Sequence, residues 1–582
     1  MAHRVADHIL ARLREWGVRR VYGCPGDGIG GFGDAFDRAG GDPELVRPRR
    51  VEAAAFMAAG HARFTGGVGV CAAADEAAAI RLLSGLYDAA LDRVPVVALV
   101  GQRRRASLGA GGGPEVGLIP LFSDVAEYAQ VCATPAQARH LVDQAMRTAA
   151  AARGVAVVIV PADVLDEHAV TVPPHGDRAV FSGVGVPAAR PVPPAEDLEA
   201  AAAVLNRGSR VAILVGQGAR GAGPELVQAA DVLGAGVAKA LLGRDVLPDE
   251  LPFVTGPIGF LGSRPSDEMV TRCDTLLVVG TGFPYAEWLP EEGRARVVQI
   301  DADPRRISAR VPVEVGLAGD AGLTLRGLIP LLRYKGERDW RRGIEEDVGE
   351  WWRILRRQAR QRFEAINPQL VAWELNGRLP DGVVLTCDPG AVTAWWARWL
   401  RLREGMRAAL SGTLGACGSA VPYAIAARLA FPDRPVIAFV DGEAFQADGM
   451  NEMATVAGYR DRLAGSGAPL VFAVFSAVGR PGSRDSAAVP CAAFADLAGL
   501  RGISCRDPER VGAVWEEALE AGGPVVLEFT VDAGVVPLPP HIMFDQARQT
   551  ARAWWHDPDR FGAAAAGFRQ KLAEFVEVRR HY

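Results

Sequence analysis

Apolar residues in the first third of the chain alternate between a helical and an extended spacing. Helical spacing occurs at residues 5–16, 53–63 and 80–90. Short apolar runs typical of buried strands lie at 20–23, 67–71, 94–100 and 155–160, and the first of them ends in a Gly-rich turn at 25–28. Strands separated by helices of this length predict right-handed crossovers and a parallel sheet that is covered on both faces.

The same alternation restarts after a Pro-rich stretch, and again after a charged segment rich in Trp and Arg. Strand-like runs lie at 211–216, 275–280 and 296–301, and then at 382–386, 436–440, 470–474 and 525–529. We therefore expect an α/β protein with three doubly wound parallel-sheet domains in series. The predicted divisions are an N-terminal domain (1–170), a Pro-rich linker (171–197), a central domain (198–335), an exposed, charged connecting helix (336–365), a third domain (366–550) and an amphipathic tail (551–582).

Composition excludes several classes of protein. The 582 residues are 49% apolar and 23% charged, which is a globular balance, and the net charge is -5. Because there is no basic surplus, we expect no nucleic-acid partner. Eight Cys without a CxxC pair argue against a zinc site or a disulfide framework. No apolar run is long enough for a signal peptide or a membrane span, so we expect a soluble, cytoplasmic protein.

Several short segments in the three predicted domains have the order and spacing of a known family. They lie at 21–28, 56–66, 83–89, 239–243, 280–285, 410–414 and 421–424. Together they resemble thiamine-diphosphate enzymes of the pyruvate oxidase and acetohydroxyacid synthase type, with most similarity to quinone-linked pyruvate oxidase-like proteins. The resemblance implies that the first domain binds the aminopyrimidine of thiamine diphosphate, the central domain FAD, and the third domain the diphosphate through Mg²⁺. It also implies a small-molecule substrate and a homodimer or homotetramer, with the active site between first and third domains of different subunits.

The first domain departs from this family at the residues used for thiamine chemistry. Val51 occupies the position of the catalytic Glu that hydrogen-bonds the aminopyrimidine. Glu52 is its neighbour, and consecutive side chains of a helix do not face the same way. One branch, resembling glyoxylate carboligase, works with Val here, so this change alone does not abolish activity. Asp75 and Glu76 replace a Gly-containing turn beside the cofactor and are expected to add bulk and negative charge.

The third domain departs at the metal and cofactor positions. Asp441 keeps the family's metal-ligand position, but Val478 replaces the Asn ligand, and an isopropyl group supplies no oxygen to Mg²⁺. Cys417 replaces the large apolar residue that bends the cofactor, and Arg50 and Ser476 replace the His of two family motifs. Drift at tolerant positions is the alternative at each site. Together the departures predict that the ordinary thiamine diphosphate and Mg²⁺ site is lost or severely weakened.

The central domain keeps the family pattern much better. Its turns after strands place small residues and backbone N–H groups where a pyrophosphate can bind at a sheet's carboxyl edge. The resemblance therefore implies FAD binding, and the alternative is that these glycines only shape the loops of a vestigial domain. The implied cofactor contacts are Gly216, Gln217, Gly218, Lys239, Thr255, Gly256, Gly280, Thr281, Gly282, Phe283, Asp301 and Asp320 in this domain, and Gly412, Leu414 and Gly442 in the third.

Charged residues near the expected cleft supply the candidate catalytic groups, which are Glu115, Arg50 and Arg81. Glu115 is the titratable residue of a Gly-rich loop that replaces the family's substrate-closing segment. An arginine cluster suits an anionic substrate through bidentate contacts, and solvated ion pairs are the alternative. His61 is expected to be a packed helix residue. The arginine cluster comprises Arg47, Arg49, Arg50, Arg81, Arg103, Arg104 and Arg105.

Three functions are compatible with these observations. The first is a pyruvate oxidase- or acetolactate synthase-like enzyme of specialised metabolism that has lost ordinary thiamine catalysis, keeps a flavin-type scaffold and acts on a small, possibly anionic metabolite. The second is a divergent thiamine-diphosphate-dependent 2-oxo acid decarboxylase, oxidase or carboligase without the catalytic Glu. The third is a silent regulatory or structural subunit. The tail 551–582 spaces apolar and basic residues helically, which suits either peripheral membrane contact or packing against protein.

Overall fold

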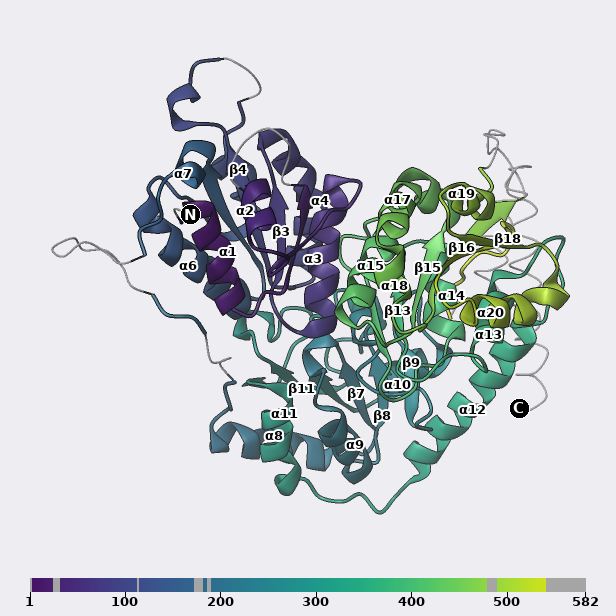
Figure 1. The fold of residues 1–582 in the computed structure, drawn as a ribbon. Coiled ribbons are helices and arrows are strands. Elements are labelled where there is room, and N and C mark those ends of the chain that lie inside the picture. Colours follow the sequence, from purple (N-terminus) through teal and green to yellow (C-terminus); the bar gives the residue numbers. More distant parts are fainter. Residues whose placement is uncertain are drawn as a thin grey trace.

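The computed structural model describes residues 3–24, 32–111, 115–171, 182–185, 190–478 and 489–540. It contains three parallel, six-stranded sheets in series with helices packed around each (Figure 1). The predicted fold class is therefore confirmed. The turn at 25–28, part of the Pro-rich linker and the whole of the tail 551–582 lie outside the described residues.

The first sheet has the strand order β2-β1-β3-β4-β6-β5. Its central strands β4 and β6 are almost fully buried and rich in Val, because helices cover both faces of a parallel sheet. The strands are β1 (Arg20–Cys24), β2 (Glu44–Val46), β3 (Gly69–Ala73), β4 (Val96–Gln102), β5 (Ala126–Val131) and β6 (Val155–Pro161). The helices are α1 (Val5–Glu15), α2 (Phe32–Arg38), α3 (Val51–Thr65), α4 (Glu76–Leu91), α5 (Leu118–Phe122), α6 (Ala138–Ala152) and α7 (Ala162–Asp166).

The central sheet has the order β12-β11-β10-β7-β8-β9. The strand order reverses between β7 and β10, and ligands of doubly wound folds bind at the carboxyl ends of strands at such a point. The strands are β7 (Val211–Val215), β8 (Gly236–Lys239), β9 (Val254–Pro257), β10 (Thr275–Val279), β11 (Arg296–Asp301) and β12 (Val315–Ala318). The helices are α8 (Ala195–Arg207), α9 (Gly223–Val232), α10 (Arg264–Arg272) and α11 (Ala321–Leu328).

The third sheet has the order β14-β13-β15-β16-β18-β17. Its strands are β13 (Val384–Cys387), β14 (Arg407–Leu410), β15 (Val436–Asp441), β16 (Leu470–Val478), β17 (Arg501–Cys505) and β18 (Pro524–Asp532). The helices are α13 (Pro368–Leu375), α14 (Ala391–Trp399), α15 (Ala420–Ala430), α16 (Gly442–Ala444), α17 (Met450–Gly458), α18 (Arg460–Ala464), α19 (Cys491–Leu497) and α20 (Val511–Leu519).

A π-helix joins α16 to α17 and spans Phe445–Gly449. A π-turn is wider than an α-turn because its hydrogen bonds reach one residue further, and such turns are frequent at functional sites. The buried ring of Phe445 lies against Gly449, where an added Cβ would be 2.7 Å from that ring. The π-helix also carries Asp448, which faces the first domain through an ion pair with Arg50.

The charged segment after the central domain forms a helix, α12 (Asp339–Ala359), that runs toward the third domain (Figure 1). The expectation of an exposed connecting helix is wrong for one of its faces. Apolar side chains at helical spacing are buried along that face, as in an amphipathic helix that covers a core. They are Ile344, Val348, Trp351, Ile354 and Leu355.

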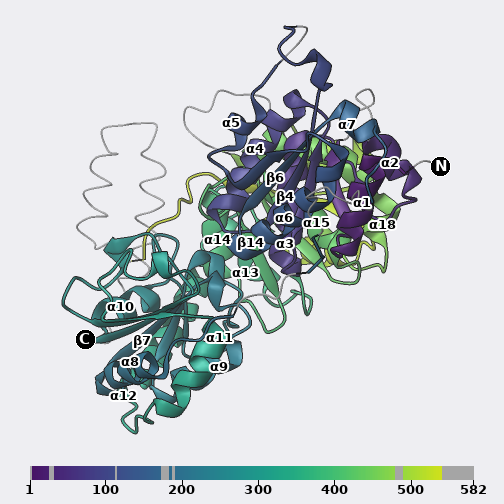
Figure 2. The same cartoon turned by 90° about the vertical axis from the view of Figure 1, so that its left-hand side faces the viewer.

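Helices α3 and α15 bring the first and third domains side by side (Figures 1 and 2). Gly60 of α3 allows this close approach, because an added Cβ would lie 3.0 Å from Cα of Tyr423 in α15. Buried residues of both helices belong to one apolar cluster that spans the two domains. In the described part of the chain, every helix is too short or too polar to cross a lipid bilayer.

Candidate functional site

A pocket of about 310 Å³ lies between the first and third domains. The N-terminal turns of α3 and residue Ser84 of α4 form one wall. The segment before α15, the π-helix and α17 form the other. The lining residues are Arg50, Glu52, Ala53, Phe56, Ser84, Leu414, Ala416, Cys417, Gly418, Pro422, Asp448 and Glu452. Both walls of this pocket belong to one chain, and the implied site between first and third domains of different subunits stays a prediction.

Val51 and Glu52 take different environments at the start of α3. Val51 is half-buried and packs against the apolar cluster shared by the two domains, whereas Glu52 lines the pocket. Oε2 of Glu52 is buried and has no hydrogen-bond partner among the described residues. Arg50 Nε lies 3.6 Å and Arg81 Nη1 3.7 Å from the Glu52 carboxylate. Phe56 follows Glu52 four residues later on the same helix face and lines the same pocket.

Two further carboxylates of the pocket wall are already paired. Glu452 is buried and accepts hydrogen bonds from the backbone N–H of Arg49 and Arg50, at 3.2 and 2.9 Å, and from the Thr455 hydroxyl at 2.7 Å. Burial raises the pKa of Glu452. Asp448 forms an ion pair with Arg50. These contacts fasten the start of α3 to the third domain, and no motif in the sequence marks either carboxylate.

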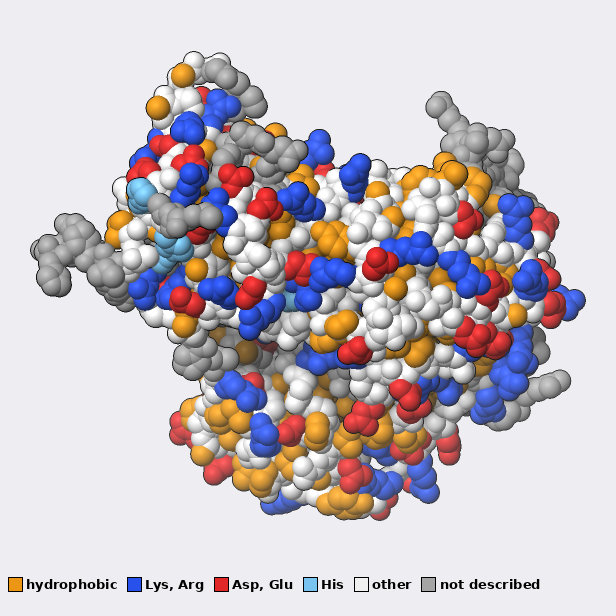
Figure 3. All heavy atoms as spheres, in the orientation of Figure 1, with side chains coloured by type: hydrophobic (Ala, Val, Ile, Leu, Met, Phe, Trp, Pro, Cys, Tyr) orange, Lys and Arg blue, Asp and Glu red, His pale blue; other side chains and the backbone are white. Residues whose placement is uncertain are grey.

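The predicted arginine cluster is largely taken up by ion pairs. Arg81 faces Glu52, and its side chain is 61% exposed. Of the seven arginines in this cluster, Arg50 is the one found among the described residues that line the pocket. Acidic and basic side chains are interspersed over the face that Figure 3 shows. These contacts favour surface ion pairs over the binding of an anionic substrate. The remaining pairs are Arg103 with Glu76, Arg104 with Asp166, and Arg105 with Asp163 and Glu167.

Glu115 lies away from the pocket lining. Its side chain is exposed, and its carboxylate accepts a hydrogen bond from the backbone N–H of Gly109 at 2.6 Å. The structure therefore brings Arg50 into the pocket but not Arg81 or Glu115, and the catalytic roles of all three stay predictions. His61 is a packed residue that contacts the Tyr22 hydroxyl at 3.1 Å, and burial lowers the pKa of His61 to about 4.

Asp75 and Glu76 serve the first domain itself. The Asp75 carboxylate caps α4 by accepting a hydrogen bond from the backbone N–H of Ala78 at 2.8 Å. Glu76 is buried and lies 3.4 Å from Arg103. Each residue therefore has a partner within its own domain, and the expectation that they place bulk and negative charge beside a cofactor stays a prediction.

The predicted metal position of the third domain lies at the ends of β15 and β16. Asp441 ends β15, and its Oδ1 accepts hydrogen bonds from the backbone N–H of Glu443 and Ala444 at 3.0 and 3.3 Å. At the end of β16 both Ala477 and Val478 are apolar. In the described residues no group of three or more His, Cys, Asp or Glu side chains is arranged to hold a metal ion. Mg²⁺ requires an octahedral shell rich in oxygen, and the side chains of Ala477 and Val478 supply none of it.

Asp388, which the sequence reasoning missed, is a buried carboxyl at the end of β13. It accepts hydrogen bonds from the backbone N–H of Ala420 at 2.9 Å and of Asp441 at 3.3 Å. Burial, with the nearby Asp441 charge, raises the pKa of Asp388 to about 7. Burial and then Asp388 and Asp441 raise the pKa of the Cys417 thiol, which is exposed. The negative charge at this edge disfavours a diphosphate that lacks a metal partner.

A buried ion network lies one turn along α4 from the pocket residue Ser84. Arg63 Nη2 is 3.1 Å from Asp88 and 2.8 Å from Asp92, and these three side chains are at most 3% exposed. The Tyr423 hydroxyl donates to Asp88, and the Arg63 guanidinium lies 5.2 Å from the Tyr423 ring centroid. Asp92 also accepts the backbone N–H of Gly412 at 2.9 Å. The network thus fixes the start of the loop that leads to the pocket residues 414–418.

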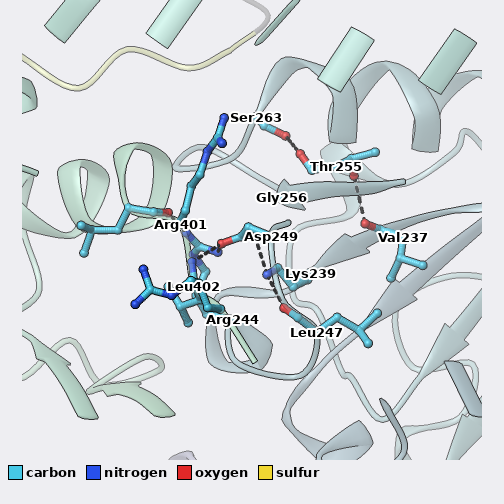
Figure 4. Close-up of polar contacts among 12 residues, drawn as sticks. Val237, Lys239, Arg244, Leu247, Asp249, Thr255, Gly256, Ser263, Arg401 and Leu402 are labelled. Atoms are coloured by element: carbon cyan, nitrogen blue, oxygen red, sulfur yellow. Dashed lines mark hydrogen bonds and ion pairs between the residues drawn. The ribbon is translucent and has the colours of Figure 1, made fainter. Parts of the chain in front are cut away.

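Several predicted cofactor residues of the central domain make contacts inside the protein. The Lys239 ammonium is buried and donates to Leu247 O at 2.9 Å and to Asp249 at 2.6 Å (Figure 4). The Thr255 hydroxyl lies 2.7 Å from that of Ser266. Asp320 caps α11 by accepting the Leu323 N–H at 2.9 Å, and Gln217 donates to Asp92 O at 2.9 Å. The assignment of the Lys239, Thr255 and Asp320 side chains to FAD is therefore not supported by their contacts.

The glycines assigned to the cofactors are needed for close backbone packing. A Cβ added to Gly216 would lie 2.4 Å from Thr281 Cβ, and one added to Gly218 would lie 2.9 Å from Gly280 Cα. Gly280 and Gly256 have positive φ, at 60° and 97°. A Cβ on Gly412 would meet the Leu242 side chain at 2.4 Å, one on Gly442 the Phe475 carbonyl at 2.7 Å, and one on Gly282 the Arg306 guanidinium at 2.9 Å.

Asp301 is the acidic residue at the end of β11. It ends β11 beside β10, so its carboxylate lies at the carboxyl edge near Gly280. Its Oδ1 accepts a hydrogen bond from the Asp303 N–H at 2.9 Å, and burial raises the pKa of Asp301. Phe283 follows on the same edge and packs against Tyr285 with ring centroids 5.5 Å apart. An acidic residue at this edge suits hydrogen bonding to a ribose or ribityl hydroxyl.

Comparison with known proteins identifies the family. The chain matches the N-terminal thiamine pyrophosphate binding domain over residues 3–121, the thiamine pyrophosphate enzyme central domain over 198–328 and the C-terminal binding domain over 388–464. It is 32% identical over 562 residues to the putative thiamine pyrophosphate-containing protein YdaP of Bacillus subtilis, covering 94% of this chain and 95% of that protein.

Two further relatives narrow the type within this family. Pyruvate oxidase of Lactiplantibacillus plantarum is 28% identical over 453 residues, covering 78% of this chain and 74% of that protein. Chloroplastic acetolactate synthase of Arabidopsis thaliana is 28% identical over 465 residues, covering 78% and 68%. The resemblance stated from the sequence motifs is thereby confirmed: the chain belongs to the thiamine pyrophosphate enzyme family, in the pyruvate oxidase and acetolactate synthase type.

Proposed function

We propose that this protein is a cytoplasmic enzyme that uses the thiamine-family scaffold to bind a small metabolite between its first and third domains, without ordinary thiamine diphosphate and Mg²⁺ catalysis. The observation that carries this proposal is the Asp441 carboxylate, which caps its own helix, while the described end of the neighbouring strand β16 consists of the apolar residues Ala477 and Val478. Val51 supports the same proposal, because it occupies the position of the family's catalytic Glu and packs against an apolar cluster.

The first test is binding of thiamine diphosphate with Mg²⁺ to the full chain. A cofactor at a hundred times its Kd would stabilise the fold by about 2.7 kcal/mol, which a thermal-unfolding assay detects easily. We expect no shift of the unfolding temperature and no heat in calorimetry at millimolar cofactor. A pyruvate oxidase that binds the cofactor serves as positive control. A saturable shift that disappears with a chelator would contradict the proposal.

A divergent thiamine-diphosphate enzyme is the second candidate. Both thiamine pyrophosphate binding domains match their families, and Asp441 at the end of β15 and Gly442 directly after it keep the family's positions. If this candidate holds, added cofactor leads to consumption of a 2-oxo acid by the purified chain. A silent subunit would instead show neither binding nor turnover alone and would co-purify with an active relative. The pocket between the domains favours a ligand-binding role over a purely structural one.

For the central domain we propose FAD binding at the carboxyl edge between β7, β10 and β11. Support comes from the reversal of strand order there and from the Asp301 carboxylate at that edge. The residues proposed to contact FAD are Asp301 and the backbone of 216–218 and 280–283, without the side chains of Lys239, Thr255 and Asp320. A homodimer or homotetramer is proposed as well, and light scattering tests it.

Flavin release tests the central-domain proposal. We expect acid treatment of the purified protein to liberate FAD, identified by chromatography, and Asp301→Ala to lower the retained fraction about tenfold, since one hydrogen bond to a charged group contributes about 1.5–3 kcal/mol. Asp274→Ala, at the opposite end of the sheet before β10, is the control and should retain the wild-type amount. A wild-type protein free of flavin would remove this part of the proposal.

A further inference from the structure

We propose that the exposed face of α12 is a docking surface for α12 of a second copy of this chain, in an antiparallel pairing held by charge. Figure 1 shows α12 along the outside of the molecule between the central and third domains. Its apolar stripe is buried, and the opposite face is open to solvent. This surface concerns the homo-oligomer suggested with the proposed function and is independent of what the interdomain pocket binds.

The exposed residues of α12 recur at intervals of three and four. This spacing keeps them on one stripe of the helix, which is the geometry through which two helices pack along their lengths. At 1.5 Å per residue the stripe is about 30 Å long. Its exposed residues are Asp339, Arg342, Glu346, Gly349, Arg353, Arg356, Arg357 and the C-cap Arg360.

The charges of this face are divided between its two halves. The exposed acids lie in the N-terminal half, and the four arginines from Arg353 onward fill the C-terminal half, where Figure 3 shows blue side chains gathered. Arginines three and four residues apart repel one another, and the helix dipole offsets this only within the last turn, beyond Arg353. Glu346, Arg356 and Arg360 take part in no ion pair among the described residues. The face therefore carries charges that its own chain leaves unneutralised.

One antiparallel register neutralises both halves at once. When Glu346 faces the second copy's Arg353, Asp339 faces the second copy's Arg360, because the midpoint of both pairs lies between residues 349 and 350. Two-fold symmetry repeats each contact, since an isologous interface uses the same surface on both copies. The register therefore forms two kinds of acid–base pair, each of them twice.

The centre of this register has room for a second helix. Gly349 lies at the midpoint, and Gly343 faces the second copy's Arg356. A Cβ added to either glycine would have no neighbour within 4 Å. Glycine inside a helix is destabilising relative to alanine, and no described residue of the chain itself packs against these two positions. A second helix that crosses here accounts for both glycines.

The same register also brings one pair of like charges together. Arg342 faces the second copy's Arg357, but Arg342 already forms an ion pair with Asp339 of its own helix, which offsets the repulsion. The face is made of charged residues and glycine, so the pairing depends on charge rather than on apolar burial. Salt screens exposed charges, and we expect the association to weaken as the ionic strength rises.

Sedimentation of the full chain at low ionic strength tests the pairing. We expect the wild type to self-associate, and Arg353→Glu and Glu346→Arg each to raise the Kd of self-association about tenfold, because each change turns two symmetry-related attractions into repulsions. The double variant exchanges the two charges and should return to within about threefold of the wild-type Kd. Arg14→Glu, which reverses an exposed arginine of α1, is the matched control. Unfolding temperatures check that every variant is folded.

Cross-linking identifies the surface independently of affinity. Gly349→Cys places a thiol beside the proposed two-fold axis, so a short bismaleimide should join two chains. Ala200→Cys, on the exposed face of α8, is the control and should not exceed the background of the wild type, whose Cys417 is exposed.

Three results would overturn the pairing of α12. They are a wild type that stays monomeric at low ionic strength, single charge variants that associate like the wild type, and a Gly349→Cys protein that cross-links no more than the wild type. An oligomer that ignores every α12 substitution would keep the proposed homo-oligomer while excluding α12 as its surface. Binding of thiamine diphosphate with Mg²⁺ would contradict the proposed function and leave the pairing of α12 standing.

Discussion

Replacement of Arg63 by Met is expected to lower the free energy of unfolding by about 3–5 kcal/mol, because it leaves two buried carboxylates without their cation. Arg63 Nη2 lies 3.1 Å from Asp88 and 2.8 Å from Asp92, and both carboxylates are fully buried. Asp92 keeps the backbone N–H groups of Gly412 and Thr413, so the larger part of the penalty falls on Asp88.

The pH dependence of this loss identifies its cause. Burial already raises the pKa of Asp88, and Arg63 is the main group that opposes this rise. Without Arg63 the folded-state pKa lies further above the unfolded value, so the stability contributed by the protonated form is present at low pH and lost as pH rises through the folded pKa. Thermal unfolding should therefore show a smaller deficit at about pH 5 than at about pH 8. Arg14→Met, on the exposed face of α1, is the control. An equal deficit at both pH values would exclude a charge effect.

Asp249→Ala should destabilise the protein by a similar amount, about 3–5 kcal/mol, and loosen the central domain from the third. Asp249 pairs with Lys239 at 2.6 Å and with Arg244, and both cations are at most 2% exposed (Figure 4). Its Oδ2 also accepts the Leu402 N–H at 2.8 Å, a bond across the two domains. The variant therefore buries two unpaired cations and removes a domain contact.

Hydrogen exchange and thermal unfolding together measure this effect. We expect faster amide hydrogen exchange around Leu402 and a lower temperature for the first unfolding transition. The first transition is used because a chain with several domains need not unfold in a single step. Burial lowers the pKa of Lys239 to about 8. Loss of Asp249 lowers the pKa of Lys239 further, so the unfolded variant binds more protons than the folded one and its stability should rise with pH. The loss of stability relative to wild type should therefore be smaller at about pH 9 than at about pH 7. Glu250→Ala, an exposed neighbour, should behave like wild type.

The fold could be predicted because its signals are local and repeated. Short Val-rich runs such as 155–160 and 211–216 are buried on both faces in the structure, and period and length distinguish them from the helices between them. The connecting helix α12 shows the limit of composition. Its many charges indicated exposure, but Trp351 and Leu355 are buried, because one stripe is enough to cover a neighbouring core.

The site was less predictable because it depends on side-chain direction and on partners far apart in the chain. The sequence located the start of α3, but not that Val51 turns to the apolar cluster and Glu52 to the pocket. Asp448 contacts the side chain of Arg50 and Glu452 contacts its backbone N–H, although these residues are 398 and 402 positions apart from Arg50 in the sequence. Such pairings follow from how the domains dock, and no local pattern encodes them.

The π-helix at Phe445–Gly449 affects how this region is aligned with the sequences of its relatives. One surplus residue in a helix rotates everything after it by about 100° relative to a regular helix. If the segment after Asp441 were treated as one regular α-helix, Asp448 and Glu452 would be placed on the helix face that points away from the first domain. In the structure both carboxylates contact that domain. Deletion of a single residue there, such as Ala447, would rotate Asp448 and Glu452 away from the first domain. A length difference of one residue can therefore change this pocket wall while the flanking motifs stay the same.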